Sequence, residues 1–207
     1  GHTPADRLLR QLASWPAAAD RDRIRLALPL VTRGPELASL KRTLKALIGS
    51  GWNNWECADL AGYHMLQECD AAPASADWSL YALNRVAQAE LARLGIASHV
   101  LSPENGLDNI RALGQTRKPS PLCEALVYQH TPLFISETEP CLPDRPHSET
   151  VPLTDRRGRT FTAQHIDNRW VTVRDAAFCI ADRLGETGLS AFRIDLSWSP
   201  ASACDAS

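Results

Sequence analysis

The stretch WSLYALNRVAQAELARLGIASHVLSPE, residues 78–104, holds the signals that decide the fold. SLYAL (79–83) and SHVLS (98–102) are short apolar runs that predict strands. Asn84 is a natural N-cap for the helix between them, and Gly95 is placed to end that helix. A strand, a helix and a second strand at this spacing indicate a right-handed βαβ unit and therefore a parallel sheet.

The same alternation extends to both sides of this unit. IRLALPLV (24–31) is a nearly continuous apolar run, which predicts a strand covered on both faces. The other predicted elements are strands at WECADL (55–60) and at ALVY into PLFIS (125–136), and helices from Pro35 to Gly49, over 62–69 and over 106–113.

The pattern changes after residue 119. Residues 119–152 hold 7 of the 14 prolines, which predicts an irregular loop rather than a helix or a central strand. Residues 151–173 alternate apolar and polar side chains around a DRRG turn, as antiparallel hairpins do. A helix over 176–187 and the strand FRIDLSW (192–198) are expected to complete the fold.

Together these elements predict an α/β fold. It is a partial TIM-barrel-like parallel sheet of about five βα units, followed by an antiparallel β-hairpin region and a final helix and strand. The expected divisions are an N-terminal helix or remnant of an upstream domain (1–22), the parallel barrel-like portion (23–140), a C-terminal extension (141–200) and a disordered tail (201–207).

Composition restricts the functional classes. The net charge of −2 over 207 residues does not support a nucleic-acid partner, although a local basic patch is compatible with that charge. No apolar run reaches membrane-spanning length, so no membrane association is expected and the chain is predicted to be cytoplasmic. In that compartment the six cysteines are expected to be free thiols or metal ligands rather than disulfides.

Polar side chains follow each predicted parallel strand. Ligands of parallel α/β folds bind at the carboxyl ends of the strands, so the candidate catalytic residues are Arg33, Asp59, Asn84, Glu104 and Glu137. Carboxylates beside an arginine and an asparagine could bind a metal or orient a small acidic or carbonyl substrate. Helix capping is the alternative for Asn84, and a place in a first helical turn is the alternative for Glu104.

Further motifs follow in a fixed order: EALVYQHTPLFISE (124–137), Cys141, LTDRRGRTF (153–161), AAFCIADRLGETG (176–188) and FRIDL (192–196). Together with residues 78–104, they resemble the C-terminal portion of peptidase family U32, the collagenase-like peptidases, over about residues 23–198. The resemblance implies a barrel-like α/β domain and, by family name, a hydrolase. For some members it implies instead an oxygen-independent hydroxylase of RNA bases or of a quinone precursor.

The resemblance also implies a 4Fe-4S cluster held by four cysteines. Cys141 and Cys179 match two of the ligand positions. No cysteine lies between 142 and 178, where a third is expected, and His147 is the soft substitute there, so the ligand set is incomplete. Cys179 has apolar neighbours, and a core position is its alternative role.

The remaining polar residues support other chemistries less well. The histidines are scattered rather than spaced as in zinc enzymes, and no GxSxG, GxGxxG or phosphate-loop pattern occurs. The basic turn of Arg156, Arg157 and Arg159 is either a solvated hairpin tip or a phosphate or RNA contact.

Two functional classes stay open. The chain is either a U32-like enzyme, or a noncatalytic, partner-dependent assembly subunit with a degenerate cluster site. The first predicted strand would be an exposed parallel edge, which needs a protein partner or a missing N-terminal barrel half. The sequence does not indicate the substrate.

Overall fold

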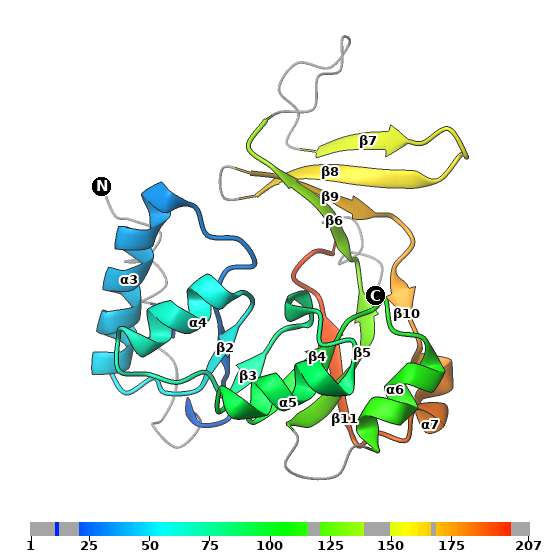
Figure 1. The fold of residues 1–207 in the computed structure, drawn as a ribbon. Coiled ribbons are helices and arrows are strands. Elements are labelled where there is room, and N and C mark those ends of the chain that lie inside the picture. Colours follow the sequence, from blue (N-terminus) through cyan, green and yellow to red (C-terminus); the bar gives the residue numbers. More distant parts are fainter. Residues whose placement is uncertain (1–10, 13–20, 116–120, 139–149, 167–168, 200–207) are drawn as a thin grey trace. The chain divides into compact units, whose positions relative to one another are not determined.

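The computed structural model describes residues 11–12, 21–115, 121–138, 150–166 and 169–199 (Figure 1). The chain divides into two compact units, residues 1–124 and 125–207, which are described separately below. The predicted fold class is confirmed, because parallel strands joined by helices are followed by an antiparallel sheet, a short helix and a last strand.

The first unit is built on short parallel strands. They are β1 (Leu26–Ala27), β2 (Trp55–Cys57), β3 (Ser75–Ala76) and β4 (Ser98–Leu101), adjacent in that order. The register pairs Ala27 with Glu56, Glu56 with Ser75, and Ser75 with Ser98, and each pairing is parallel. The next strand, β5 (Leu122–Gln129), begins in this unit and continues into the second.

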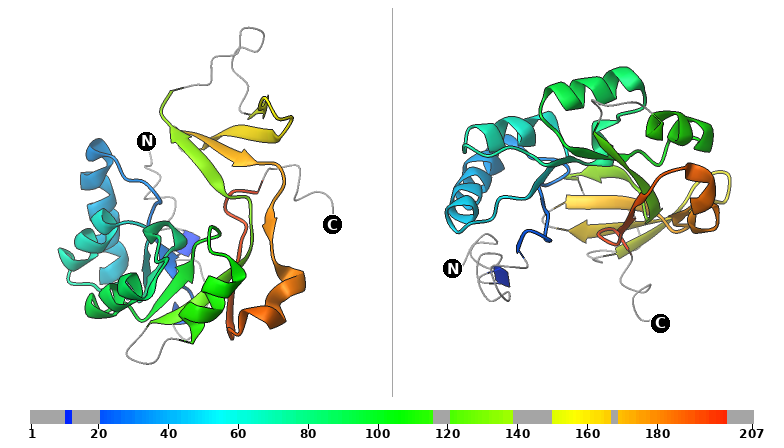
Figure 2. Two further views of the ribbon diagram at one scale, coloured as in Figure 1. Left: turned by 45° about the vertical axis from the view of Figure 1, so that its right-hand side comes forward. Right: turned by 90° about the horizontal axis from the view of Figure 1, so that it is seen from below.

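Four helices follow these strands and lie along one side of them, as in part of a barrel (Figure 2). They are α3 (Gly34–Gly49), α4 (Leu60–Gln67), α5 (Arg85–Arg93) and α6 (Leu107–Gly114). All four agree with predicted helices to within a few residues. The residue after α5, Leu94, is followed by Gly95 with a φ of +83°, a backbone conformation that glycine adopts at low cost.

The core of the first unit lies between the strands and the helices. Trp55 of β2 packs with Leu44 and Leu47 of α3 and Leu66 of α4, all at most 3% exposed. Burial of each such side chain stabilises the fold by about 1.5–3 kcal/mol. A second cluster joins Cys57 and Ala76 to Leu91 of α5. The odd-numbered side chains of β2 therefore face the helices, and Glu56 faces the opposite side of the sheet.

The second unit contains the predicted antiparallel hairpins. Its four-stranded sheet has the order β6-β9-β8-β7, with every pairing antiparallel. The strands are β6 (Pro132–Ser136), β7 (Thr150–Thr154), β8 (Thr160–Ile166) and β9 (Arg169–Arg174). The predicted DRRG turn joins β7 to β8, and its Gly158 has a φ of +74°.

The segment after this sheet differs from the prediction. Instead of one helix over 176–187, the structure has β10 (Phe178–Cys179), a 3-10 turn (Ala181–Arg183) and the four-residue helix α7 (Leu184–Thr187). The predicted helix was wrong because β10 pairs with β5, and Ile180 N–H donates to the Val127 carbonyl. The final strand β11 (Ala191–Asp195) also pairs with β5.

Two predicted strands were also wrong. SLYAL is not a strand, since β3 lies upstream of it and Trp78–Leu80 form a 3-10 turn that Asp77 caps. ALVY into PLFIS is not one strand but two, since β5 and β6 belong to different sheets. The break falls at His130 and Thr131, where the apolar pattern gives no sign of it.

Within the described part of the chain, no helix is both long enough and apolar enough to span a membrane. The tail over 201–207 and most of the N-terminal segment over 1–22 lie outside the described residues.

Candidate functional site

Four of the five predicted catalytic residues follow neighbouring parallel strands. Arg33 lies after β1, Asp59 after β2, Asn84 after β3 and Glu104 after β4. Because these strands are parallel and adjacent, the loops at their carboxyl ends form one rim of the first unit. This rim is the candidate functional site.

Two of the rim side chains cap helices. The Asp59 carboxylate accepts a hydrogen bond from Gly62 N–H at 2.6 Å, at the start of α4. The Asn84 amide oxygen accepts one from Ala87 N–H at 2.9 Å, at the start of α5. Each cap satisfies a backbone donor that the helix itself leaves open. The capping role left open for Asn84 is therefore observed, and Asp59 has the same role.

Arg33 occupies the N-cap position of α3, where its backbone N–H donates to Glu36 Oε2 at 2.9 Å. Glu104 differs from the other three residues because it does not lie at the start of a helix: α6 begins only at Leu107. Its expected place in a first helical turn was wrong, and it lies instead in the loop after β4. Glu104 N–H donates to the buried Ser102 Oγ at 3.2 Å, and the Glu104 side chain is exposed.

The loop between β3 and α5 adds aromatic residues that the sequence did not predict. Tyr81 is 48% exposed and has a φ of +50°, a strained left-handed conformation for a residue other than glycine. It contacts the ring of Trp78 edge to face, with ring centroids 6.2 Å apart. The available sequence signal for this turn was Asp77, because an acidic residue directly before an apolar turn is a capping residue.

Glu137 is not part of the rim. The sequence predicts that it follows a fifth parallel strand, and this prediction was wrong, since Glu137 follows β6 of the antiparallel sheet. Glu137 therefore belongs to the second unit.

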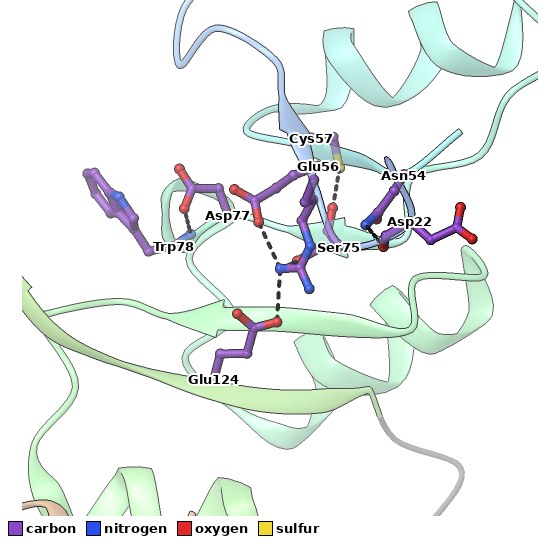
Figure 3. A network of polar contacts seen from close by, with 9 residues as sticks. Asp22, Asn54, Glu56, Cys57, Ser75, Asp77, Trp78 and Glu124 are labelled. Atoms are coloured by element: carbon purple, nitrogen blue, oxygen red, sulfur yellow. Dashed lines mark hydrogen bonds and ion pairs between the residues drawn. The ribbon is translucent and has the colours of Figure 1, made fainter. Parts of the chain in front are cut away.

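The face of the parallel strands opposite the helices carries a polar cluster of Arg25, Glu56, Ser75 and Glu124 (Figure 3). Arg25 Nη1 lies 3.2 Å from Glu56 Oε2, 2.9 Å from Glu124 Oε1 and 3.0 Å from Ser75 Oγ. The side chain of Glu56 is 1% exposed and that of Glu124 is 12% exposed, whereas that of Arg25 is 33% exposed. One guanidinium thus partners two largely buried carboxylates.

This cluster is more consistent with stability than with catalysis. Arg25 precedes β1, Ser75 begins β3 and Glu124 is near the start of β5, so the cluster lies toward the amino ends of the strands. Ligand sites in parallel α/β folds lie at the other end. Sequence reasoning missed it because single charged residues inside short apolar strands carry no periodic signal.

The described cysteines divide into buried and exposed thiols. Cys57, Cys69 and Cys123 are buried, and Cys179 on β10 is exposed. Burial raises the pKa of Cys57 to about 12 and that of Cys123 to about 11. The core position considered for Cys179 was wrong, because pairing with β5 places it in a strand with its side chain exposed.

We expect Cys179 to react with iodoacetamide at pH 8 at least about 100-fold faster than Cys57 or Cys123, since the thiolate is the reactive form and burial also blocks access. The measurement is a time course of alkylation, followed by mass spectrometry of the tryptic peptides. Denatured protein, in which all three thiols should react alike, is the control. Comparable rates in the folded chain would contradict the burial of Cys57 and Cys123.

The predicted cluster ligands are only partly described. Cys141 and His147 lie outside the described residues. Among the residues that are described, no three His, Cys, Asp or Glu side chains gather in a way that could hold a metal ion. The described residues therefore contribute only Cys179 as an exposed thiol toward a 4Fe-4S cluster, and four-thiolate ligation stays a prediction.

A second buried polar group lies on the helix side of β4. His99 is 0% exposed, and its Nε2 lies 3.5 Å from Gln88 Nε2 of α5 and 3.9 Å from Cys123 Sγ of β5. Gln88 Nε2 also donates to that sulfur at 2.9 Å. Burial lowers the pKa of His99 to about 4, so the ring is neutral at pH 7.

Comparison of the chain with protein-family models, curated proteins and solved structures gave no match.

Proposed function

We propose that the chain is the C-terminal portion of a U32-like barrel enzyme, with its substrate site at the rim formed by the loops after β1 to β4. The observation that carries this proposal is the placement of Arg33, Asp59, Asn84 and Glu104 after four successive parallel strands. The order of βα units, hairpins and last strand also supports the proposal.

The rim residues divide into reacting and positioning groups. Glu104 is exposed, and its carboxylate has no hydrogen-bond partner among the described residues, so it is free to exchange a proton with a substrate. Arg33 is exposed on the rim and supplies a positive charge for an acidic or carbonyl substrate. Asp59 and Asn84 hold the starts of α4 and α5, and thereby the shape of the rim.

The proposal includes completion of the barrel by further parallel strands. In the described sheet, β1 is the terminal strand and pairs only with β2. An unpaired parallel edge exposes backbone donors and acceptors that another strand can satisfy. A partner chain or an N-terminal barrel half pairing with β1 would extend the sheet and enlarge the rim.

Changing Glu104 to glutamine is expected to lower turnover at least about 100-fold, because a general acid or base contributes about that much or more. The assays follow the two family activities: cleavage of a fluorescent gelatin substrate, and hydroxylation by anaerobically purified protein, scored by mass spectrometry of RNA and of a quinone precursor. Glu90→Gln, an exposed substitution on α5 outside the rim, is the matched control. Equal activity of the two variants would remove Glu104 from the mechanism.

A noncatalytic assembly subunit is the second candidate. The observation that favours it is the use of Asp59 and Asn84 as helix caps, which gives both side chains a structural role. Its signature would be absence of turnover in every assay above, together with a stable complex with a barrel-completing partner. Iron and sulfide analysis of the anaerobically purified chain tests the cluster separately from both candidates.

A further inference from the structure

The antiparallel sheet of the second unit carries an open groove of about 720 Å³ that the proposed function does not use. Its lining combines apolar and aromatic side chains with two arginines and polar groups: Leu133, Phe134, Leu153, Thr154, Asp155, Arg159, Phe161, Thr172 and Arg174. All of them belong to β6, β7, β8, β9 and the DRRG turn, except Arg159, which lies between that turn and β8. The volume is within the range of pockets that hold small organic ligands.

Strand register explains why the apolar and aromatic side chains of β7 and β8, and Arg174, share one face. Leu153 pairs with Phe161, and Phe161 pairs with Arg174, and directly opposite residues project to the same side of an antiparallel sheet. Phe134 pairs with Thr172, two residues from Arg174 and therefore also on this side.

A β-bulge in β6 adds a second apolar side chain from the same strand. The register between β6 and β9 shifts between Pro132 and Phe134, which leaves Leu133 as the extra residue. A bulge re-aims side chains, so Leu133 and Phe134 line the same groove although they are adjacent in sequence. Leu133 is 43% exposed and Phe134 is 69% exposed, so both side chains are accessible to a ligand.

The charge in the groove is positive and held in place. Asp155 accepts hydrogen bonds from the backbone N–H groups of Arg157 and Arg159, and from Arg159 Nε at 2.7 Å. These contacts, the Arg159 backbone N–H foremost, lower the pKa of Asp155 and fix the Arg159 guanidinium 6.0 Å from the Phe161 ring centre. The nearby Asp175 accepts from Thr162 Oγ1, which projects to the other face of the sheet.

Arg174 is the cation left for a ligand. Its side chain lines the groove, and its guanidinium contacts no acidic side chain among the described residues. With Arg159 offset by Asp155, the lining carries one net positive charge next to the exposed ring of Phe134. An anion that also presents a flat apolar surface would satisfy both features.

We propose that this groove binds an aromatic phosphate ester of nucleotide size, with its ring against Phe134 and Phe161 and its phosphate on Arg174. The forked guanidinium matches phosphate oxygens, and aromatic side chains stack on flat rings. The size of the groove favours a nucleotide over a single-ring anion. This inference is independent of the proposed function, because it uses only residues of the second unit.

The test is calorimetric titration of the whole chain with adenosine 5′-monophosphate, adenosine, phenyl phosphate and inorganic phosphate. We expect saturable binding of the monophosphate, weaker binding of phenyl phosphate, and at least about 10-fold weaker binding of adenosine and of phosphate, because each lacks one of the two contacts. Equal binding of phosphate and monophosphate, or of adenosine and monophosphate, would overturn the two-part site. Absence of saturable binding of the monophosphate would show that the groove is not a nucleotide site.

Matched variants locate the site. Arg174→Gln and Phe134→Ser are each expected to weaken monophosphate binding at least about 5-fold, and both residues are exposed enough for the variants to fold. Arg42→Gln on α3 and Phe192→Ser on β11 make the same chemical changes at exposed positions outside the groove. Equal losses of affinity in the groove variants and in these controls would place binding elsewhere. Circular dichroism of every variant is the test of folding.

Discussion

Replacing Arg25 by methionine is expected to lower the free energy of unfolding by about 3 kcal/mol, because it leaves Glu56 and Glu124 without their shared cation. Glu56 has 1% side-chain exposure and cannot recover the lost interaction from water. The value is at the low end for a broken buried pair, since the Arg25 side chain is itself 33% exposed. Urea unfolding followed by tryptophan fluorescence measures it.

Two further variants separate burial from charge in this measurement. Arg93→Met removes an ion pair with Glu90 in which both side chains are more than half exposed, and should cost under about 1 kcal/mol. The double variant Arg25→Met, Glu56→Gln should recover part of the loss, because it removes one of the two carboxylate charges that Arg25 offsets. If Arg25→Met and Arg93→Met lose the same stability, the cluster is not an important stabilising interaction.

The cluster also illustrates what the sequence could not show. Arg25 and Glu124 are 99 positions apart, and only the sheet brings them together. Each is a single charge beside a short strand, and such charges are usually solvated. Local patterns predicted the features that depend on local rules, such as Asn84 as the N-cap of α5 and glycines at the end of α5 and in the DRRG turn.

The errors have a common physical cause. β3 and β10 have two residues each, too few for any periodicity, and they are strands only because a neighbouring strand supplies hydrogen bonds. The apolar run after β3 predicts a strand, but it forms a 3-10 turn and the strained loop at Tyr81. Residues 176–187 have helical composition, yet pairing with β5 overrides that preference at Phe178 and Cys179.

The candidate site was predictable in part for the same reason. The rule that ligands meet the carboxyl ends of parallel strands selected Arg33, Asp59, Asn84 and Glu104 without knowledge of tertiary contacts. It failed for Glu137, because that choice required β5 and β6 to be one strand. The groove at Phe134 and Arg174 could not be predicted, since it depends on a bulge and on cross-strand register.

Acidification from pH 7 to pH 5 is expected to destabilise the chain by about 2 kcal/mol through His99 alone. The pKa of this ring is lowered to about 4 in the folded chain, mainly by burial, against an ordinary value of 6.5. Between these two values the unfolded chain binds a proton that the folded chain does not, so stability is present above pH 6.5 and is lost as the pH falls toward 4. The full loss approaches about 3 kcal/mol, at 1.36 kcal/mol for each pKa unit.

The surroundings of His99 explain why the folded chain does not bind a proton at this ring above about pH 5. Gln88 and Cys123 are the polar side chains in contact with the ring, and His99 Nδ1 has no hydrogen-bond partner among the described residues. Glu124 favours the charged ring slightly, but its effect is smaller than that of burial. A charged imidazolium at this position would therefore lack both solvent and an acidic hydrogen-bond partner.

The measurement is the free energy of unfolding between pH 7 and pH 5 for the natural chain and for His99→Leu. Over this range His99→Leu should lose about 2 kcal/mol less than the natural chain, whatever its stability at pH 7, because it removes only this titration. His64→Leu makes the same substitution at an exposed histidine on α4 and is the matched control for the substitution itself. Should His99→Leu not fold, NMR titration of the natural chain decides the question, since the His99 ring signals should stay constant to pH 5. A His99 titration midpoint near 6.5 would refute the prediction, because it would mean that the folded chain binds this proton as readily as the unfolded one.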